Sequence, residues 1–311
     1  MEKQSTAKAT VIKNTGSHYL VSNLPDWNII CCTVRGKLRL NDIKTTNPVA
    51  VGDIVEYDIQ EDGTGIIKKI FPRKNYIIRK STNLSRQAHI IAANIDLALL
   101  VVTLDYPETP LAFIDRFLVT CEAYRVPVKI ILNKSDLNSD ISEKVNRFVS
   151  LYSSAGYTTI EVSCVTGQNI DLIKSECKGK VTLFSGVSGV GKSTLINTLD
   201  SSLHLKTREI SEYHLQGKHT TTYYEIHPII SGGFVIDTPG IRGFGLLEIN
   251  PEELSHYFPE MLKVLGNCRF APCTHTHEPG CAVKEAVENG IIATERYASY
   301  LGMLEEEGKY R

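Results

Sequence analysis

The chain has 311 residues, of which 42% are hydrophobic and 22% charged. This composition predicts a folded protein of about two or three domains and excludes a largely disordered one. The formal net charge of −1 argues against a protein held to nucleic acid by bulk electrostatics. The charge is uneven, however: the first 80 residues contain 13 Lys and Arg against 8 Asp and Glu, and the remainder 21 against 27. A basic N-terminal part predicts a large anionic partner that is contacted at one face.

The N-terminal segment MEKQSTAKAT has no apolar stretch behind its charges, so it is not a secretory signal. The strongest apolar run, Leu97–Leu104, is too short to span a bilayer. We therefore expect a cytoplasmic protein with no membrane contact. In a reducing compartment the eight cysteines should not form disulfides, and five scattered ones are expected in the core: Cys31, Cys32, Cys121, Cys164 and Cys177.

Residues 1–78 are expected to form a small β-barrel of the oligonucleotide-binding (OB) type. The sequence alternates with a strand period between turn signals and predicts the strands Thr10–Asn14, His18–Ser22, Ile29–Arg35, Ile54–Gln60 and Gly65–Phe71. Any five-stranded barrel or sandwich would fit this pattern. One strand ends in the basic segment Arg35–Arg39, which is either part of an anion-binding face or a solvated edge that prevents aggregation.

Residues 79–245 alternate strands with helices, which is typical of a doubly wound parallel sheet whose ligands lie at the carboxyl ends of the strands. The expected strands are Leu97–Thr103, Val128–Leu132, Thr159–Val162, Val181–Ser185 and Val235–Ile236. The expected helices are Phe113–Tyr124, Ile141–Ala155, Ile170–Cys177 and Thr194–Leu199.

A phosphate-binding loop follows the fourth of these strands and precedes the last helix. It matches the pattern G-x-x-x-x-G-K-[ST] with Gly186, Val187, Ser188, Gly189, Val190, Gly191, Lys192 and Ser193, and Thr194 opens the helix. Glycines let backbone N–H groups turn toward the phosphates, and the helix N-terminus adds positive potential. Lys192 is expected to reach the β- and γ-phosphates, and the Ser193 hydroxyl to bind Mg²⁺.

An N-K-x-D sequence directly after a strand predicts that the base is guanine; it consists of Asn133, Lys134, Ser135 and Asp136. The Asp136 carboxylate can accept from N1–H and the 2-amino group of guanine, and adenine has no donor at either position. Asn133 can donate to the base or brace the loop. Ser163 and Cys164 close the next strand and fit a weaker motif, in which a backbone N–H contacts guanine O6.

The sequence Asp237-Thr238-Pro239-Gly240 fits the D-x-x-G motif. We expect Asp237 to hold Mg²⁺ through water and the Gly240 N–H to contact the γ-phosphate. The segment 217–222 between the phosphate loop and this motif contains three threonines, and Thr221 is one candidate for the Mg²⁺ ligand. In most GTPases the phosphate loop comes first, whereas here N-K-x-D precedes it. The order is therefore circularly permuted, and the chain after D-x-x-G leads directly into the last domain.

Residues 246–311 are expected to be helical around a cluster of cysteine and histidine. Cys268, Cys273, His275 and Cys281 fall within 14 residues, and His277 is an alternative imidazole. Three thiolates and one imidazole can complete a tetrahedral zinc site without an open position, so we expect one structural rather than catalytic Zn²⁺.

Together these motifs resemble the ribosome small-subunit-dependent GTPase A family, over essentially the whole chain. The resemblance implies an OB-type barrel that binds RNA, GTP hydrolysis stimulated by the small (30S) ribosomal subunit during its late assembly, and zinc on Cys268, Cys273, His275 and Cys281. It also implies that the partners are the small subunit with its rRNA and GTP or GDP; a monomer is expected.

The residue after D-x-x-G, often a water-orienting Gln, is Ile241, whose alkyl side chain cannot position a nucleophilic water. His219 is the candidate for that role, with Lys192 as the second catalytic candidate; a surface histidine in a loop is the alternative for His219. An RNA-binding assembly scaffold with bound GTP and negligible turnover is the competing function. An ATP-dependent kinase or ATPase is opposed by the N-K-x-D sequence.

Overall fold

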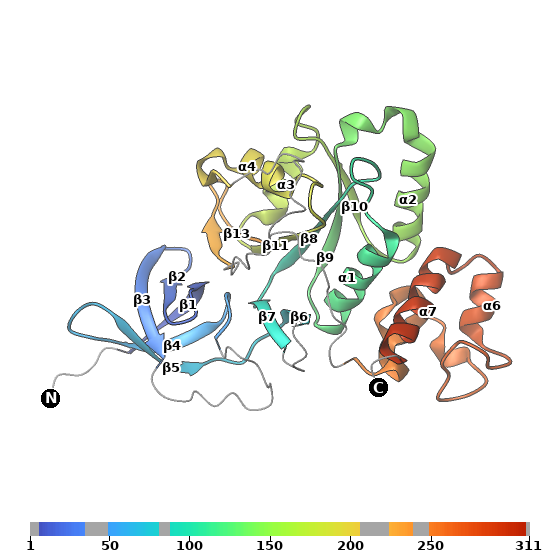
Figure 1. Cartoon of the computed structure of the whole chain (residues 1–311), viewed down its shortest axis with the longest axis horizontal. Helices are drawn as coiled ribbons and strands as arrows, with labels where there is room; N and C mark the ends of the chain where they lie inside the picture. The colour runs from blue at the N-terminus through green and yellow to red at the C-terminus, as the bar shows by residue number, and fades with distance from the viewer. Residues whose placement is uncertain (1–5, 35–48, 81–87, 206–223, 239–248, 309–311) are drawn as a thin grey trace, which may run out of the picture.

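The computed structural model describes residues 6–34, 49–80, 88–205, 224–238 and 249–308. A β-barrel, a central sheet flanked by helices and a helical C-terminal part follow one another along the chain (Figure 1). The basic segment 35–39 and the expected site residues His219, Thr221 and Gly240 lie outside the described residues, as does Ile241.

The N-terminal barrel is closed, with the strand order β1-β2-β3-β5-β4. Its strands are β1 (Thr6–Asn14), β2 (Tyr19–Asn23), β3 (Asn28–Val34), β4 (Ile54–Ile59) and β5 (Gly65–Ile70). All pairings are antiparallel except that of β3 with β5. Alternate side chains fill the interior, among them Val11, Val21, Val55 and Ile67. The expected barrel is therefore confirmed.

A hairpin that the sequence did not indicate connects the barrel to the sheet. It consists of β6 (Tyr76–Lys80) and β7 (Ala88–Ala93), so the boundary expected after residue 78 falls within β6. Ile77 and Ile91 from the hairpin and Ile12 from the barrel belong to the same apolar cluster as the sheet. A Cβ on Gly52 would lie 2.0 Å from the Ala93 carbonyl oxygen, which shows how closely barrel and hairpin approach. The barrel is thus packed against the central domain rather than tethered by a free linker.

The central sheet has six strands in the order β10-β9-β8-β11-β13-β12. The first five are parallel and β12 is antiparallel to β13. The strands are β8 (Leu97–Val102), β9 (Val128–Asn133), β10 (Thr159–Val162), β11 (Val181–Ser185), β12 (Ile226–Pro228) and β13 (Phe234–Asp237). The helices are α1 (Leu111–Ala123), α2 (Ser142–Ser154), α3 (Ile170–Cys177) and α4 (Lys192–Leu199).

Helices cover both faces of this sheet. Every residue of β8 is buried because its alternate side chains enter two different cores. Leu100 and Val102 pack in the cluster that contains residues of α1 and α2, whereas Leu99 and Val101 pack in the cluster with α3 and α4. This two-sided burial explains the nearly continuous apolar run of that strand. The doubly wound expectation is confirmed.

The C-terminal part contains two 3₁₀ segments, Pro251–Tyr257 and Leu265–Asn267, and the helices α5 (Pro259–Leu262), α6 (Ala282–Glu288) and α7 (Thr294–Gly308). It packs on α1, and Val119 of α1 belongs to its apolar core. Arg296 of α7 is 1% exposed and donates to Asp115 of α1 at 2.7 Å and to Glu260 of α5 at 2.7 Å. Burial lowers the pKa of Arg296, but the attraction of Asp115 and the contacts with Glu260 outweigh it and raise the pKa overall. Arg296 therefore stays charged, and its ion pair with Asp115 links α7 of the C-terminal part to α1 of the central domain.

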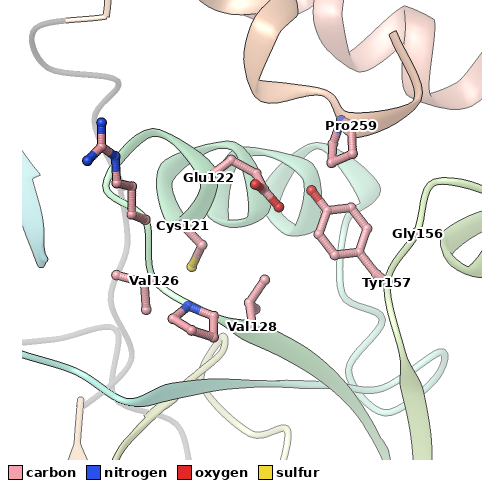
Figure 2. Close-up of a pocket in the computed structure, with 9 residues that line it drawn as sticks. Cys121, Glu122, Val126, Val128, Gly156, Tyr157 and Pro259 are labelled. Carbon is pink, nitrogen blue, oxygen red and sulfur yellow. The ribbon is translucent and has the colours of Figure 1, made fainter. Parts of the chain in front are cut away.

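A cavity of about 340 Å³ lies beside this contact. Figure 2 shows Glu122 and Tyr157 facing one another there, with Pro259 above them from the C-terminal part and Val128 below. Val128 begins β9, so this cavity is at the amino-terminal edge of the sheet, away from the edge where the motif loops gather. In the described part of the chain no helix is long and apolar enough to span a bilayer.

Candidate nucleotide and metal sites

The predicted phosphate loop connects the end of β11 to α4, which begins at Lys192. Lys192 is 7% exposed, and its Nζ lies inside the loop, donating to the carbonyl oxygens of Gly186 at 2.7 Å and Val187 at 3.0 Å. Ser193 is half-buried in the first turn of α4, while Ser188 and Thr194 are exposed. The loop therefore encloses a cation at the N-terminus of a helix, an arrangement that attracts anions.

Asn133, at the end of β9, ties the predicted base-reading motif to the phosphate loop. Its Nδ2 donates to the Val190 carbonyl at 2.8 Å in a buried position. Gly191 has φ +92°, and a Cβ there would lie 2.5 Å from the same Nδ2 atom. Gly191 is thus required both by its backbone conformation and by the approach of Asn133. Of the two roles expected for Asn133, the structure shows that of a brace.

Lys134 makes a second connection between the two motifs. Its Nζ donates to the Gly189 carbonyl at 2.9 Å and to the Tyr106 carbonyl at 2.6 Å. Tyr106 lies in the loop after β8, which the sequence did not mark as part of the site. Loops after β8, β9 and β11 therefore meet at one ammonium group.

Asp136 is exposed, and its carboxylate is oriented by the next motif along the chain. The Ser163 hydroxyl donates to Asp136 Oδ1 at 2.5 Å and accepts from the backbone N–H groups of Val165 and Thr166.

Two further contacts join these motifs. Gln168, which the sequence analysis did not identify, accepts from the Ser135 hydroxyl at 2.9 Å. The Cys164 Sγ lies 4.0 Å from Asn133 Oδ1. The two motifs expected at the base are thus in direct contact.

Asp237 ends β13, in register with Phe184 on the neighbouring strand β11. Its Oδ1 is buried and has no hydrogen-bond partner among the described residues. Burial raises the pKa of Asp237, and the charges of Lys192 and His227 oppose that shift. Burial also lowers the pKa of Lys192, while Asp237 opposes the change. An ammonium and a carboxylate therefore lie near each other at the carboxyl end of two central strands. His227, on β12, had no motif that could have identified it.

Cys268, Cys273, His275 and Cys281 form the cluster expected in the C-terminal part. Their ligand atoms all lie within 4.8 Å of one another. His275 Nδ1 is 3.3 Å from the Cys281 Sγ and 3.7 Å from the Cys268 Sγ. His277 is exposed and contacts Thr276 instead, so the structure selects His275 from the two histidines.

Other side chains hold the backbone of this cluster in place. The hydroxyl of Tyr297 donates to the His275 carbonyl at 2.6 Å, and that of Tyr300 to the Thr274 carbonyl at 2.7 Å. The Glu278 carboxylate accepts from the backbone N–H groups of Thr274 and Thr276. Both tyrosines come from α7, so the helix that carries Arg296 also positions the cluster.

Comparison with known proteins agrees with this geometry. Residues 70–247 match the model of the RsgA GTPase family and residues 8–67 that of the RsgA N-terminal domain. The chain is 54% identical over 307 residues to the small ribosomal subunit biogenesis GTPase RsgA of Bacteroides fragilis, covering 98% of this chain and 99% of that protein. It is 50% identical to the protein of the same name from Porphyromonas gingivalis, with 97% of each covered.

Two solved structures share the fold. The crystal structure of YjeQ from Thermotoga maritima superposes with a TM-score of 0.77 at 37% identity, covering 97% of this chain and 98% of that one. The structure of YloQ, described as a circularly permuted GTPase, gives a TM-score of 0.74 at 30% identity over 100% and 98% of the two chains. The resemblance inferred from the motifs is confirmed, as is the permuted arrangement: this chain is a GTPase and belongs to the RsgA family.

Proposed function

We propose that this protein binds and hydrolyses GTP in the late assembly of the small ribosomal subunit, and that the subunit stimulates its turnover. The relatives' names support the process. The observation that carries the nucleotide assignment is the pair of contacts, Asn133 to Val190 and Lys134 to Gly189, that hold a guanine-reading motif against a phosphate loop. Its partners are GTP, GDP and the small subunit with its rRNA. The protein acts as a monomer in the cytoplasm.

The residue roles follow from these positions. The phosphates bind to backbone N–H groups of residues 186–193 and of Thr194 in the first turn of α4. Lys192, which now donates to the carbonyls of Gly186 and Val187, donates to phosphate oxygens instead when the nucleotide binds. Asp136 reads the guanine edge, with Ser163 orienting its carboxylate and Cys164 beside it. The barrel of residues 1–78 contacts RNA, residues 79–245 form the GTPase domain, and residues 246–311 form the zinc-binding part.

Magnesium fits the phosphate site. The buried Oδ1 of Asp237 has no hydrogen-bond partner among the described residues, so a donor or a cation would satisfy it, and Mg²⁺ prefers oxygen ligands. Ser193 and Asp237, the latter through water, would hold the ion, with Thr221 as the third candidate. When bound, Mg²⁺ neutralises charge on the β- and γ-phosphates.

Zinc fits the C-terminal cluster. Sulfur atoms around a tetrahedral zinc lie about 3.8 Å apart, which the spread of at most 4.8 Å among these ligand atoms accommodates. Burial and the neighbouring thiols of Cys281 and Cys268 raise the pKa of the Cys273 thiol, and a divalent cation bound by the cluster would favour its deprotonated form. Three cysteines and His275 complete the coordination, which makes the site structural.

The proposal is tested by multiple-turnover phosphate release with and without purified small subunits. We expect slow turnover by the protein alone and strong acceleration by the subunit. Negligible turnover in both conditions would instead support an assembly scaffold. In the same assay, His219→Ala should reduce stimulated turnover by about 10²-fold with nearly unchanged GTP affinity, if His219 positions the attacking water. Full stimulated activity of that variant would assign the role elsewhere.

A further inference from the structure

The loop between β8 and α1 contains an aromatic residue that no motif assigns. Tyr106 is 75% exposed, yet it lies beside the phosphate loop. Its backbone has φ +52°, in the left-handed region that a residue with a side chain rarely adopts. Such conformations persist only where the surrounding structure imposes them, and they concentrate at functional sites.

The surrounding structure does impose this conformation. The backbone N–H of Thr109 donates to the Thr103 carbonyl at 2.9 Å, and the Thr103 hydroxyl donates to the Pro107 carbonyl at 2.6 Å. These bonds close a tight loop with Tyr106 at its tip. The Pro107 ring lies against Gly189 of the phosphate loop, 3.3 Å from where a Cβ on that glycine would be. Tyr106 is therefore held in place by contacts on both sides.

The position of this tip relative to a nucleotide follows from the two assigned motifs. The base is read at Asp136 and the phosphates are bound at 186–193, so the ribose that joins them has to pass between. The contact between Lys134 Nζ and the Gly189 carbonyl spans that interval. The same Nζ donates to the Tyr106 carbonyl at 2.6 Å, which anchors Tyr106 at the interval.

We propose that the Tyr106 ring covers the ribose of the bound guanine nucleotide and slows its dissociation. An aromatic ring that loses water against a sugar gains apolar contact, and the anchored backbone reduces the entropy lost on binding. The contact makes no use of the base edge, so it adds affinity without adding discrimination between guanine and adenine. The inference rests on the proposed GTP-binding function.

The test compares Tyr106→Ala with Tyr106→Phe in the full-length protein. Affinities for unlabelled GDP and GTP are measured by calorimetry, and dissociation of GDP is measured by displacement. Tyr106→Ala should weaken both nucleotides by about tenfold, mainly through faster dissociation, while Tyr106→Phe stays within about twofold of wild type. The ratio of GTP to ATP affinity should not change, because Asp136 remains.

Ile230→Ala provides a matched control, since Ile230 is 80% exposed on the turn between β12 and β13. It should leave affinity unchanged. The thermal unfolding of Tyr106→Ala should match wild type because the side chain packs little. Unchanged nucleotide affinity in Tyr106→Ala, or equal losses in Tyr106→Ala and Tyr106→Phe, would overturn the proposal. Failure of the wild-type protein to bind GTP would instead refute the proposed function itself.

Discussion

The nucleotide site and the Cys/His cluster are built in opposite ways. The described residues of the nucleotide site come from loops, strand ends and the start of α4, spread between Tyr106 and Asp237. They meet because parallel strands end at one edge of the sheet. The second comes from 14 consecutive residues, with two tyrosines from α7 supporting the backbone. One site therefore takes its geometry from a preformed core, whereas the other is a ligand set that could hold a metal and that we propose a metal completes.

This difference predicts that, of the substitutions considered, loss of a zinc ligand has the largest effect on folding. Cys273→Ser should lower zinc from about one per chain and unfold the C-terminal part, because metal binding contributes folding free energy there. GTP binding should largely persist, since the ligands lie outside the nucleotide loops. Zinc content by elemental analysis, together with proteolysis of 251–311, checks this. His277→Ala is the matched control and should retain zinc, because that residue is exposed and its ring contacts Thr276. Zinc loss from this control would show that the ligand assignment is wrong.

At the nucleotide site a single substitution should change specificity rather than folding. Asp136→Asn replaces an acceptor pair by a donor and an acceptor, so GTP affinity should fall by about 10²-fold while xanthosine triphosphate, with a carbonyl at C2, binds better. Competition binding with both nucleotides measures the exchange. Because Ser163 can still donate to the remaining amide oxygen, the loop should stay in place. Equal loss of both nucleotides would mean that Asp136 serves only the fold.

The smallest effect on stability or binding is expected at the contact between α1 of the central domain and the C-terminal part. Arg296→Lys keeps the charge between Asp115 and Glu260 but cannot reproduce the forked contacts of the guanidinium. We expect the free energy of unfolding to fall by about 2 kcal/mol, with GTP affinity and zinc content unchanged. Chemical denaturation measures the first. A drop in GTP affinity would show that the two regions are coupled through α1 rather than independent.

Most strands and helices were predictable because their periodicity is local. The strands β10 and β11 and the helix α3 have the bounds expected, and β8 could be identified because burial on both faces leaves a continuous apolar run. The hairpin of β6 and β7 was missed because its apolar residues pack between the barrel and the central sheet. That contact joins segments distant in sequence, so no local periodicity indicates it. β12 was missed because it has only three residues, paired at the edge of the sheet.

The sequence by itself determined the chemistry of both sites: a phosphate loop, a guanine-reading motif and a Cys/His ligand set are each written in short, contiguous segments. It also determined the permuted order, which is a property of the chain. The sequence favoured His275 as the imidazole ligand, with His277 as the alternative, and the tertiary structure brings His275 to the three cysteines whereas His277 contacts Thr276. The tertiary structure alone brought the carbonyls of Tyr106 and Gly189 to the ammonium group of Lys134, and Arg296 against Asp115. Those contacts join residues distant in sequence, and packing of the strands and helices brings them together.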